Sequence, residues 1–386
     1  MFQTEVHFTQ QNKQTVVDPF FQANYAGILQ RIDDIDPVRY AKSRNYLNGA
    51  VTRLSPWISR GVISTKTVYH RMLAKGFRLE DMESLVKELC WRDYFQRVWQ
   101  NKDIDRDLKQ IQEPVAHHML PNALLDAKTG IEALDLAIRE LFSTGYMHNH
   151  CRMYLSSVTC NIAQAHWKTP AHWMYYHLLD GDWASNACSW QWVAGSNSGK
   201  KYVANQENIN RYTGSSQTGS YLDCTYEELL TQKIPSAFSS FGPFEQKTKL
   251  PQTEAPTLNP DLPTFVYNYY NMDPEWHKGE PGNRILLLEP TIFGRYPVSD
   301  NCLEFLMFQC RNIPNIQIMT GSFEELKKMA GHSPIIFKEH PLNRHYSGKE
   351  ESRDWICEEV TGYYPSFFAY WKVVEKHLRK QESETE

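Results

Sequence analysis

Residues 180–192 read DGDWASNACSWQW, a stretch that combines two acids, two amides and three tryptophans. Asp180 and Asp182 flank a glycine, and two neighbouring carboxylates repel each other unless a cation pairs with one of them. Arg152 is the natural partner for one of the two. The same spacing also fits acid–base hydrolysis by paired carboxylates. By itself, therefore, this stretch leaves a ligand site and a hydrolytic site open.

Upstream, the stretch TGYMHNHCRM, which ends at Met153, predicts a helix. Side chains four residues apart lie on one helix face, which pairs Asn149 with Met153 and His148 with Arg152. His148 and His150 then point to different faces, and two histidines at i and i+2 on a helix are poorly placed to share a metal ion. We therefore expect no zinc here.

The stretch ELCWRDYFQRVW starts at Glu88 and also predicts a helix. Glu88, Trp91, Arg92 and Phe95 lie at i, i+3, i+4 and i+7, which places them on one face. An acid, a large ring and a guanidinium on one stripe suit an aromatic ligand that also forms hydrogen bonds. The alternative is a buried amphipathic helix with one ion pair.

The stretch GAVTRLSPWISRGVIST starts at Gly49 and contains a helix start. Thr52, Arg53 and Ser55 stand just before that start. Backbone N–H groups at a helix N-terminus bind phosphate, and an arginine and hydroxyls add charge and donors. The alternative is simple capping of the helix by Ser55.

The composition is that of a soluble globular protein. The 386 residues include 41 basic and 45 acidic side chains, a net charge of −4, with 41% apolar residues. At about 100–200 residues per domain, this length predicts two or three domains. The chain has no apolar run of about 18 residues and no secretion signal, so we expect a cytoplasmic protein with no membrane partner. Its eight cysteines form no C-x-x-C pair, which predicts reduced thiols and no bound metal.

The pattern along the chain changes three times. Asp18-Pro19, Asp36-Pro37 and Ser55-Pro56 predict helix starts, and no strand alternation follows them. Later, three short apolar runs alternate with helices, which predicts a parallel sheet. The expected parts are a helical domain (1–230), a linker or surface-wrapping segment (231–282), a small α/β domain (283–380) and a frayed tail (381–386).

Taken in order, the motifs T-x-L-S-P, E-L-x-W-R, M-H-N-x-x-R-M and D-G-D-x₃-N-x₃-W-Q-W resemble the flavin domain of the DNA photolyase/cryptochrome family. The resemblance covers about residues 18–213. It implies a mainly α fold: an all-helical FAD-binding domain, here followed by a small C-terminal α/β domain. The run after Trp192 is similar to that of divergent prokaryotic members, and the family's N-terminal antenna domain is expected to be absent.

The resemblance implies that FAD is the cofactor. Asp180 and Asp182 match positions along the flavin ring and ribityl chain, and Asn186 matches the residue facing flavin N5. Arg152 matches the arginine paired with the first aspartate. The remaining expected cofactor contacts, most of them on the phosphate side, are Tyr40, Thr52, Arg53, Leu54, Ser55 and Arg92.

The resemblance also implies a substrate, a cyclobutane pyrimidine dimer flipped out of UV-damaged DNA. Two tryptophans would form an apolar slot, while an acid and an amide meet the polar edges of the bases. Glu88 could donate a proton if burial raises its pKa. The matching residues are Glu88, Trp91, Asn149, Met153 and Trp192.

Family members reduce the flavin through a chain of tryptophans. Trp190 and Trp167 match the positions nearest the flavin and in the middle. The outermost position falls near Pro114, so another aromatic residue would end the chain, or the path is shorter. The candidates for that end are Trp173, Tyr154 and Tyr176.

The resemblance therefore predicts a deoxyribodipyrimidine photolyase, a carbon–carbon lyase in which Glu88, Asn149, Trp190 and Trp167 are the catalytic group. The alternative is a cryptochrome-like blue-light sensor that binds FAD without repairing DNA. We expect neither an antenna chromophore nor an iron–sulfur cluster. The strand-end loops of the C-terminal part, at Glu289-Pro290 and Glu339-His340, could bind a ligand, and this part could dock a partner.

Overall fold

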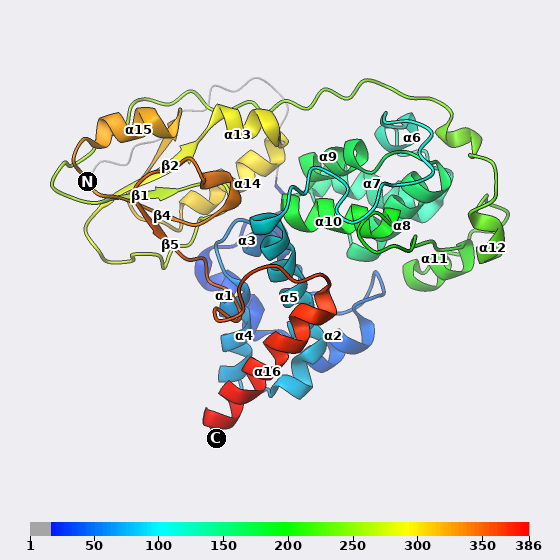
Figure 1. Ribbon diagram of the computed structural model, residues 1–386, viewed down its shortest axis with the longest axis horizontal. Coiled ribbons are helices and arrows are strands. Elements are labelled where there is room, and N and C mark those ends of the chain that lie inside the picture. Colours follow the sequence, from blue (N-terminus) through cyan, green and yellow to red (C-terminus); the bar gives the residue numbers. More distant parts are fainter. Residues whose placement is uncertain (1–16, 386) are drawn as a thin grey trace.

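The computed structural model describes residues 17–385 and shows a helical part joined to a five-stranded parallel sheet (Figure 1). This confirms the predicted fold class, mainly α with a small α/β part. Predictions that concern residues 1–16 and residue 386 lie outside the described residues. Every helix in the described range is too short or too polar to cross a lipid bilayer.

The helical part is built from short and medium helices around one long one. They are α1 (Tyr25–Asp33), α2 (Pro37–Ser43), α3 (Ser55–Ser59), α4 (Thr65–Ala74), α5 (Leu79–Asn101), α6 (Asn122–Leu125), α7 (Glu132–Thr144), α8 (Asn149–Ser157), the π-helix η2 (Val158–Ile162), α9 (Lys168–His177), α10 (Trp183–Ala194), α11 (Gln206–Thr213) and α12 (Tyr226–Leu229). The prediction of a helix start at Asp36-Pro37 is confirmed. The Asp36 side chain accepts two backbone N–H groups of α2, and Pro37 takes the first helical position.

The other two predicted helix starts are wrong in detail. Asp18 caps only a short 3₁₀ turn, η1 (Pro19–Phe21), and α1 starts afresh at Tyr25 with Asn24 as its cap. Ser55 is the first residue of α3 and not its cap, which is Leu54 and forms no side-chain capping bond. The reason is that Arg53 adopts a left-handed backbone conformation, φ 51°, so the chain enters the helix one residue earlier.

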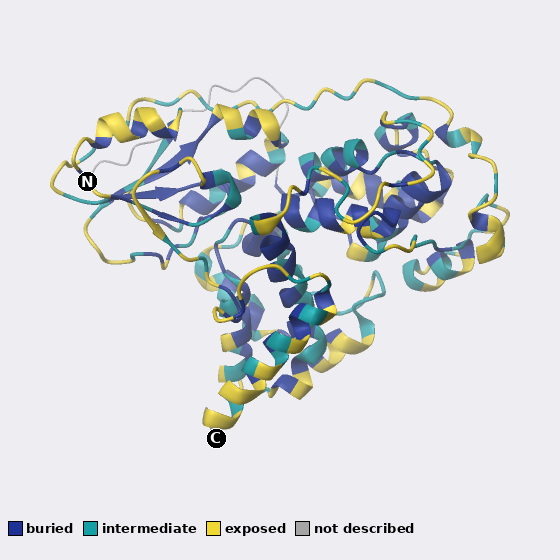
Figure 2. Ribbon diagram, viewed as in Figure 1, coloured by how far each residue is buried: buried dark blue, intermediate teal, exposed yellow. Residues whose placement is uncertain are grey.

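Helix α5 is 23 residues long and organises the helical part. It packs against α2, α4, α10 and α16 (Phe367–Thr385). Because neighbours cover most of its surface, even charged residues of its second half, such as Asp93 and Arg97, are buried (Figure 2). On the predicted ligand-binding face, Phe95 is buried, whereas Glu88, Trp91 and Arg92 are half-buried.

The sheet has the strand order β3-β2-β1-β4-β5, with all neighbouring pairs parallel. Its strands are β1 (Thr264–Tyr267), β2 (Asn283–Leu288), β3 (Ile316–Thr320), β4 (Ile335–Lys338) and β5 (Lys349–Glu351), and its helices are α13 (Pro290–Arg295), α14 (Asp300–Cys310) and α15 (Phe323–Ala330). β1 is the central strand, with Val266 paired to Ile285 on one side and Phe337 on the other.

The sequence predicted only three of these five strands. β1 was missed because four apolar or hydroxyl residues after a proline-rich run give too short a pattern, and it lies in the segment expected to be a linker. β5 was missed because its residues are Lys-Glu-Glu, which pair at the sheet edge with two of the three residues exposed to water.

The segment before β1 runs along the outside of the molecule from α12 to the sheet (Figure 1). It is held at the edge strand β3, where the Thr320 backbone N–H donates to Thr253 and its hydroxyl donates to the Pro251 carbonyl. At the other end of the chain, α16 leaves the sheet and packs on α5. Residues predicted to complete the α/β part thus lie against the helical part.

The two parts are joined through Arg60, at the end of α3. Its buried guanidinium lies 3.6 Å from the ring centroid of Tyr269 and donates to the Gly181 carbonyl. A second bond joins the hydroxyls of Tyr175 and Tyr270, 2.7 Å apart. The loop after β1 is thereby fixed to the glycine between Asp180 and Asp182.

Candidate functional site

A cavity of about 540 Å³ opens in the helical part between α2, α3, α5, α8 and α10. This volume is in the range of cofactor and substrate pockets. Its walls bring together side chains that are far apart in the sequence. All the predicted site residues except Leu54 and Trp167 line it: Tyr40, Thr52, Arg53, Ser55, Glu88, Trp91, Arg92, Asn149, Arg152, Met153, Asp180, Asp182, Asn186, Trp190 and Trp192.

Asp182 lies at the start of α10 and lines the cavity. Its carboxylate accepts the N–H of Arg92 at 3.2 Å and that of Gln96 at 2.6 Å. It also accepts the hydroxyl and backbone N–H of Ser185, which makes it the N-cap of α10. A carboxylate with four donors is fixed in place.

Asp180 is paired with Arg152, as predicted, at 2.9 Å. Arg152 also donates to the Met147 carbonyl, so its guanidinium is anchored on α8. The second carboxylate oxygen of Asp180, Oδ1, is buried and finds no partner among residues 17–385. An unpartnered buried acceptor is costly, and a ligand donor in the cavity would satisfy it.

Asn186 lies one turn into α10, and its side chain is nearly buried. Its amide nitrogen donates to the Ala171 carbonyl at 2.7 Å. The amide group is thereby held by α9, while the residue lines the cavity. This leaves the amide oxygen as the group that can meet a ligand.

The predicted phosphate-side residues lie in the loop before α3. Thr52 accepts the Leu54 backbone N–H, and Arg53 lies over the ring of Tyr146, 5.2 Å from its centroid. Leu54 is 1% exposed and packs in the core, so only its backbone could meet a ligand. Thr52, Arg53 and Ser55 line the cavity together with Tyr40 of α2.

Glu88 lines the same cavity and is paired with Arg44 at 2.9 Å. Burial raises the pKa of Glu88, and the charge and hydrogen bond of Arg44 oppose that rise. On the neighbouring α8, the Asn149 amide contacts the sulfur of Met153 at 3.7 Å. An acid, an amide and a thioether therefore face the same space.

The two tryptophans of the predicted slot differ in their surroundings. The ring of Trp91 stacks on Phe367 of α16, with centroids 3.8 Å apart and planes 9° from parallel. Trp192 lies at the rim, 37% exposed, with Tyr202 as its aromatic neighbour. One face of Trp91 is therefore occupied, and a ligand can stack only on the other.

The two tryptophans of the predicted electron-transfer chain differ in their position relative to the cavity. Trp190 is buried and lines the cavity, whereas Trp167 lies deeper, with its indole N–H donating to Asp107 at 2.6 Å. The indole ring next to Trp167 is that of Trp183, with centroids 6.4 Å apart. Trp183 in turn lies 5.6 Å from Tyr296 of the α/β part.

Sequence reasoning missed three residues that shape this site: Arg44, Gln96 and Phe367. Gln96 follows Glu88 and Arg92 at i+8 and i+4, so the helical spacing could have shown it. Arg44 and Phe367 reach the site from other helices, and the sequence carries no signal for either contact.

One group of possible metal ligands lies away from the cavity. Ligand atoms of Cys357, Glu359 and His377 lie within 4.8 Å of one another. The Cys357 thiol donates to the Glu359 carboxylate at 3.4 Å, which accounts for their closeness without an ion. All eight cysteines are free thiols in the structure, as predicted.

Comparison with known proteins finds a family model and relatives that match the helical part. Residues 85–223 match the family model described as the FAD binding domain of DNA photolyase. A deoxyribodipyrimidine photo-lyase of Streptomyces griseus is 32% identical over 155 residues, which are 38% of this chain and 32% of that protein. One of Thermus thermophilus is 32% identical over 187 residues, 46% of this chain and 43% of that protein.

Cryptochromes match as well. A chloroplastic/mitochondrial cryptochrome DASH of Ostreococcus tauri is 29% identical over 215 residues, 52% of this chain and 38% of that protein. Among solved structures, a Synechocystis cryptochrome aligns at 25% identity with a TM-score of 0.46, over 53% of this chain and 46% of that one.

The fold and the cavity define a protein with a helical FAD-binding domain. Over residues 85–223 this domain matches the FAD binding domain of DNA photolyase, and the curated relatives to which the chain is similar are DNA photolyases and cryptochromes. It spans less than half the length of the curated relatives it matches.

Proposed function

We propose that this protein is a deoxyribodipyrimidine photolyase, which uses FAD and light to split cyclobutane pyrimidine dimers in UV-damaged DNA. One observation carries the proposal. A single cavity is lined by two sets of side chains, here called its first and second walls: the carboxylates of Asp180 and Asp182, and the residues Glu88, Trp91 and Asn149. A cofactor and a substrate bound against these walls would touch each other.

The first wall fits FAD. Asp180 Oδ1 is a buried acceptor that lacks a donor among the described residues, and flavin N–H or ribityl hydroxyl groups are donors. Asp180, Asp182, Asn186 and Arg152 would hold the flavin end, and the residues before α3 would hold the phosphates. When bound and reduced, FAD supplies the photoexcited electron for dimer cleavage, and the electron returns at the end of the cycle.

The second wall suits a flipped pyrimidine dimer. A dimer leaves the duplex at low cost because it already stacks poorly. The open face of Trp91 and the rim residue Trp192 offer apolar surface to its rings. Glu88, with its raised pKa, offers a hydrogen bond to a base carbonyl, and Arg44 holds that carboxyl in place.

Electron supply through Trp190 and Trp167 is part of the same proposal. Both indole rings are buried, so neither depends on solvent contact for its position. Asp107 accepts the indole N–H of Trp167 and would stabilise positive charge on that ring. Trp183 extends this aromatic path beyond Trp167.

A light-sensing protein without repair activity is the second candidate. A cryptochrome DASH is among the curated relatives, and Phe367 covers one face of Trp91. A sensor would keep the FAD wall and the tryptophans but would not use Glu88 and Asn149 on a lesion.

The test is repair of an oligothymidine that carries cyclobutane dimers. The purified full-length chain, with FAD and a reductant, is illuminated while recovery of thymine absorbance is followed. We expect recovery in the parent and a loss of at least about tenfold in Glu88→Gln and Asn149→Ala, with FAD content unchanged.

Glu83→Gln is the matched control, because Glu83 lies on the same helix but pairs with Lys87 outside the cavity. Repair as efficient in both cavity variants as in the parent would show that the lesion wall is wrongly assigned. FAD binding with a light-driven spectral change but no repair by the parent would select the sensor.

A further inference from the structure

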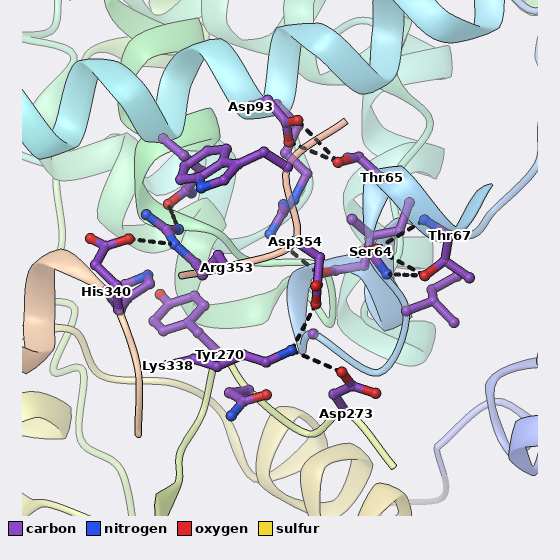
Figure 3. A pocket seen from close by; sticks show the side chains of 18 of the residues that line it. Ser64, Thr65, Thr67, Asp93, Tyr270, Asp273, Lys338, His340, Arg353 and Asp354 are labelled. Carbon is purple, nitrogen blue, oxygen red and sulfur yellow. Dashed lines mark hydrogen bonds and ion pairs between the residues drawn. The ribbon is translucent and has the colours of Figure 1, made fainter. Parts of the chain in front are cut away.

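A second cavity, of about 90 Å³, lies where the sheet meets the helical part (Figure 3). Its walls are the turn between α3 and α4, the middle of α5, and the loops that follow β1, β4 and β5. These loops leave the carboxyl ends of three parallel strands, so the cavity lies at the carboxyl edge of the sheet.

The strand order shows that this cavity lies at the point where the direction of strand addition changes. From β1 the chain adds β2 and β3 on one side and then β4 and β5 on the other. The order therefore reverses between β1 and β4, and ligands of open α/β sheets bind outside the carboxyl ends of strands at such a switch point. Asn271 follows β1, and His340 follows β4.

Three nitrogen donors line this cavity without a hydrogen-bond partner in the described part of the chain. His340 is 4% exposed, and its Nδ1 accepts the Leu342 backbone N–H, so its unpartnered Nε2 carries the proton. Asn271 is 5% exposed, and its amide nitrogen is unpartnered. The third donor is Nη2 of Arg353.

Each carboxylate of the same walls accepts at least one hydrogen bond. Lys338 donates to both Asp273 and Asp354 at 2.8 and 2.7 Å (Figure 3). Glu339 accepts Arg353 Nε at 3.0 Å, and Asp93 accepts the Thr65 hydroxyl. The three unpartnered donors remain, and a buried donor without an acceptor destabilises the folded protein.

We propose that this cavity is a binding site for a small oxyanion, a carboxylate or a phosphate group, held by His340, Asn271 and Arg353. About 90 Å³ is the room of about three water molecules, enough for one such group. A ligand that accepts hydrogen bonds would satisfy these three donors. The arginine adds charge to the hydrogen bonds.

The site is connected to the first cavity. Arg353 Nη1 donates to Gln96 at 2.6 Å, and Gln96 donates to Asp182 at 2.6 Å. An anion on Arg353 would thus be two hydrogen bonds away from the carboxylate at the cofactor wall. This connection rests on the proposed FAD site, whereas anion binding itself does not.

The test is isothermal titration calorimetry of the whole chain, which measures the heat of binding. The chain is titrated with inorganic phosphate and, separately, with acetate, at an ionic strength held constant with NaCl. We expect saturable binding of one anion per chain, and the stronger of the two probes identifies the group. Asn271→Asp keeps the shape but replaces the donor by a like charge, so it should weaken binding by at least about tenfold.

His340→Phe is the second variant, because it keeps a ring against Tyr270, 4.4 Å away in the parent, and removes the Nε2 donor together with the Nδ1 acceptor of the Leu342 backbone N–H. Asn259→Asp is the control, an exposed position where the same change keeps the existing bond to Asp261. Heats no larger than those of NaCl for both probes, or parent-like binding by both cavity variants, would overturn the proposal.

Discussion

Trp91 of α5 and Phe367 of α16 stack face to face, with ring centroids 3.8 Å apart and planes 9° from parallel. Phe367 is 3% exposed, so the contact is part of the core as well as of the cavity wall. Such a pair contributes about 0.5–1.5 kcal/mol beyond the burial of its area. The first residue of the C-terminal helix thus sets the orientation of an indole that faces the candidate lesion site.

Replacing Phe367 with alanine should therefore affect stability and repair together. We expect unfolding free energy to fall by about 3–5 kcal/mol in Phe367→Ala, because a buried ring is lost. Repair yield per bound FAD should fall as well, since Trp91 would lose its fixed orientation. Urea unfolding and the dimer-repair assay measure the two effects. Phe368→Ala, at a residue 73% exposed, is the neighbouring control and should change neither.

Removing the cation beside Asp180 should weaken cofactor binding. Arg152→Gln leaves the Asp180 carboxylate buried without its charge partner, and we expect FAD affinity to fall on the order of 100-fold. Titration with FAD, followed by flavin fluorescence, gives the dissociation constant. Arg106→Gln removes an exposed ion pair with Asp103 and should leave it unchanged. Parent-like affinity of Arg152→Gln would mean that this wall does not hold the cofactor.

The buried carboxyl of Asp93 should make stability depend on pH. Burial raises its pKa from 3.8 to about 6, against hydrogen bonds from Ile356 and Thr65 that lower it. The protonated form is favoured in the folded state, so this contribution is complete below about pH 4 and is lost as the pH rises through 6. A difference of 2.2 pKa units corresponds to about 3 kcal/mol.

Asp93→Asn has no ionisable group at this position, so it should not lose folding stability as the pH rises through 6. Relative to the parent, its unfolding free energy should rise by roughly 3 kcal/mol between pH 4 and pH 7. Urea unfolding at a series of pH values measures the difference. The control is Asp103→Asn, at an exposed residue. A difference between Asp93→Asn and the parent that does not vary with pH would contradict the assignment.

We expect the proposed aromatic path, Trp190, Trp167 and Trp183, to determine the rate of flavin photoreduction. The ring of Trp183 is 6.4 Å from that of Trp167, whereas the aromatic neighbours of Trp173 are Phe142 and His177. We expect Trp183→Phe to slow photoreduction as Trp167→Phe does, and Trp173→Phe to leave it unchanged. Flash illumination with an external donor measures the rate. If Trp173→Phe alone slowed it, the path would run elsewhere.

Repair by chemically reduced protein separates this role from the lesion site. Trp183 and Trp167 lie outside the residues that line the first cavity. With the flavin reduced in advance, both phenylalanine variants should therefore repair dimers as the parent does.

The residues of the proposed flavin wall were predicted from the resemblance of one short motif to a known family. Asp180, Asp182 and Asn186 lie within seven positions: Asp180 precedes α10, Asp182 caps it and Asn186 lies in its first turns. The pairing of Arg152 with Asp180 also followed, since two nearby carboxylates require a cation. The parallel sheet was predicted from apolar runs, but β1 and β5 were too short or too polar to be recognised.

The sequence by itself determined the helices, because local periodicity acts over a few residues, and the resemblance of its motifs to a known flavin domain implied the FAD-binding fold and the residues that carry its chemistry. Only the tertiary structure decided that Arg44 pairs with Glu88, that Phe367 covers Trp91, and that three donors meet at the switch point of the sheet. These contacts join segments up to hundreds of residues apart. They arise from packing of whole helices and strands, which leaves no periodic trace in the sequence.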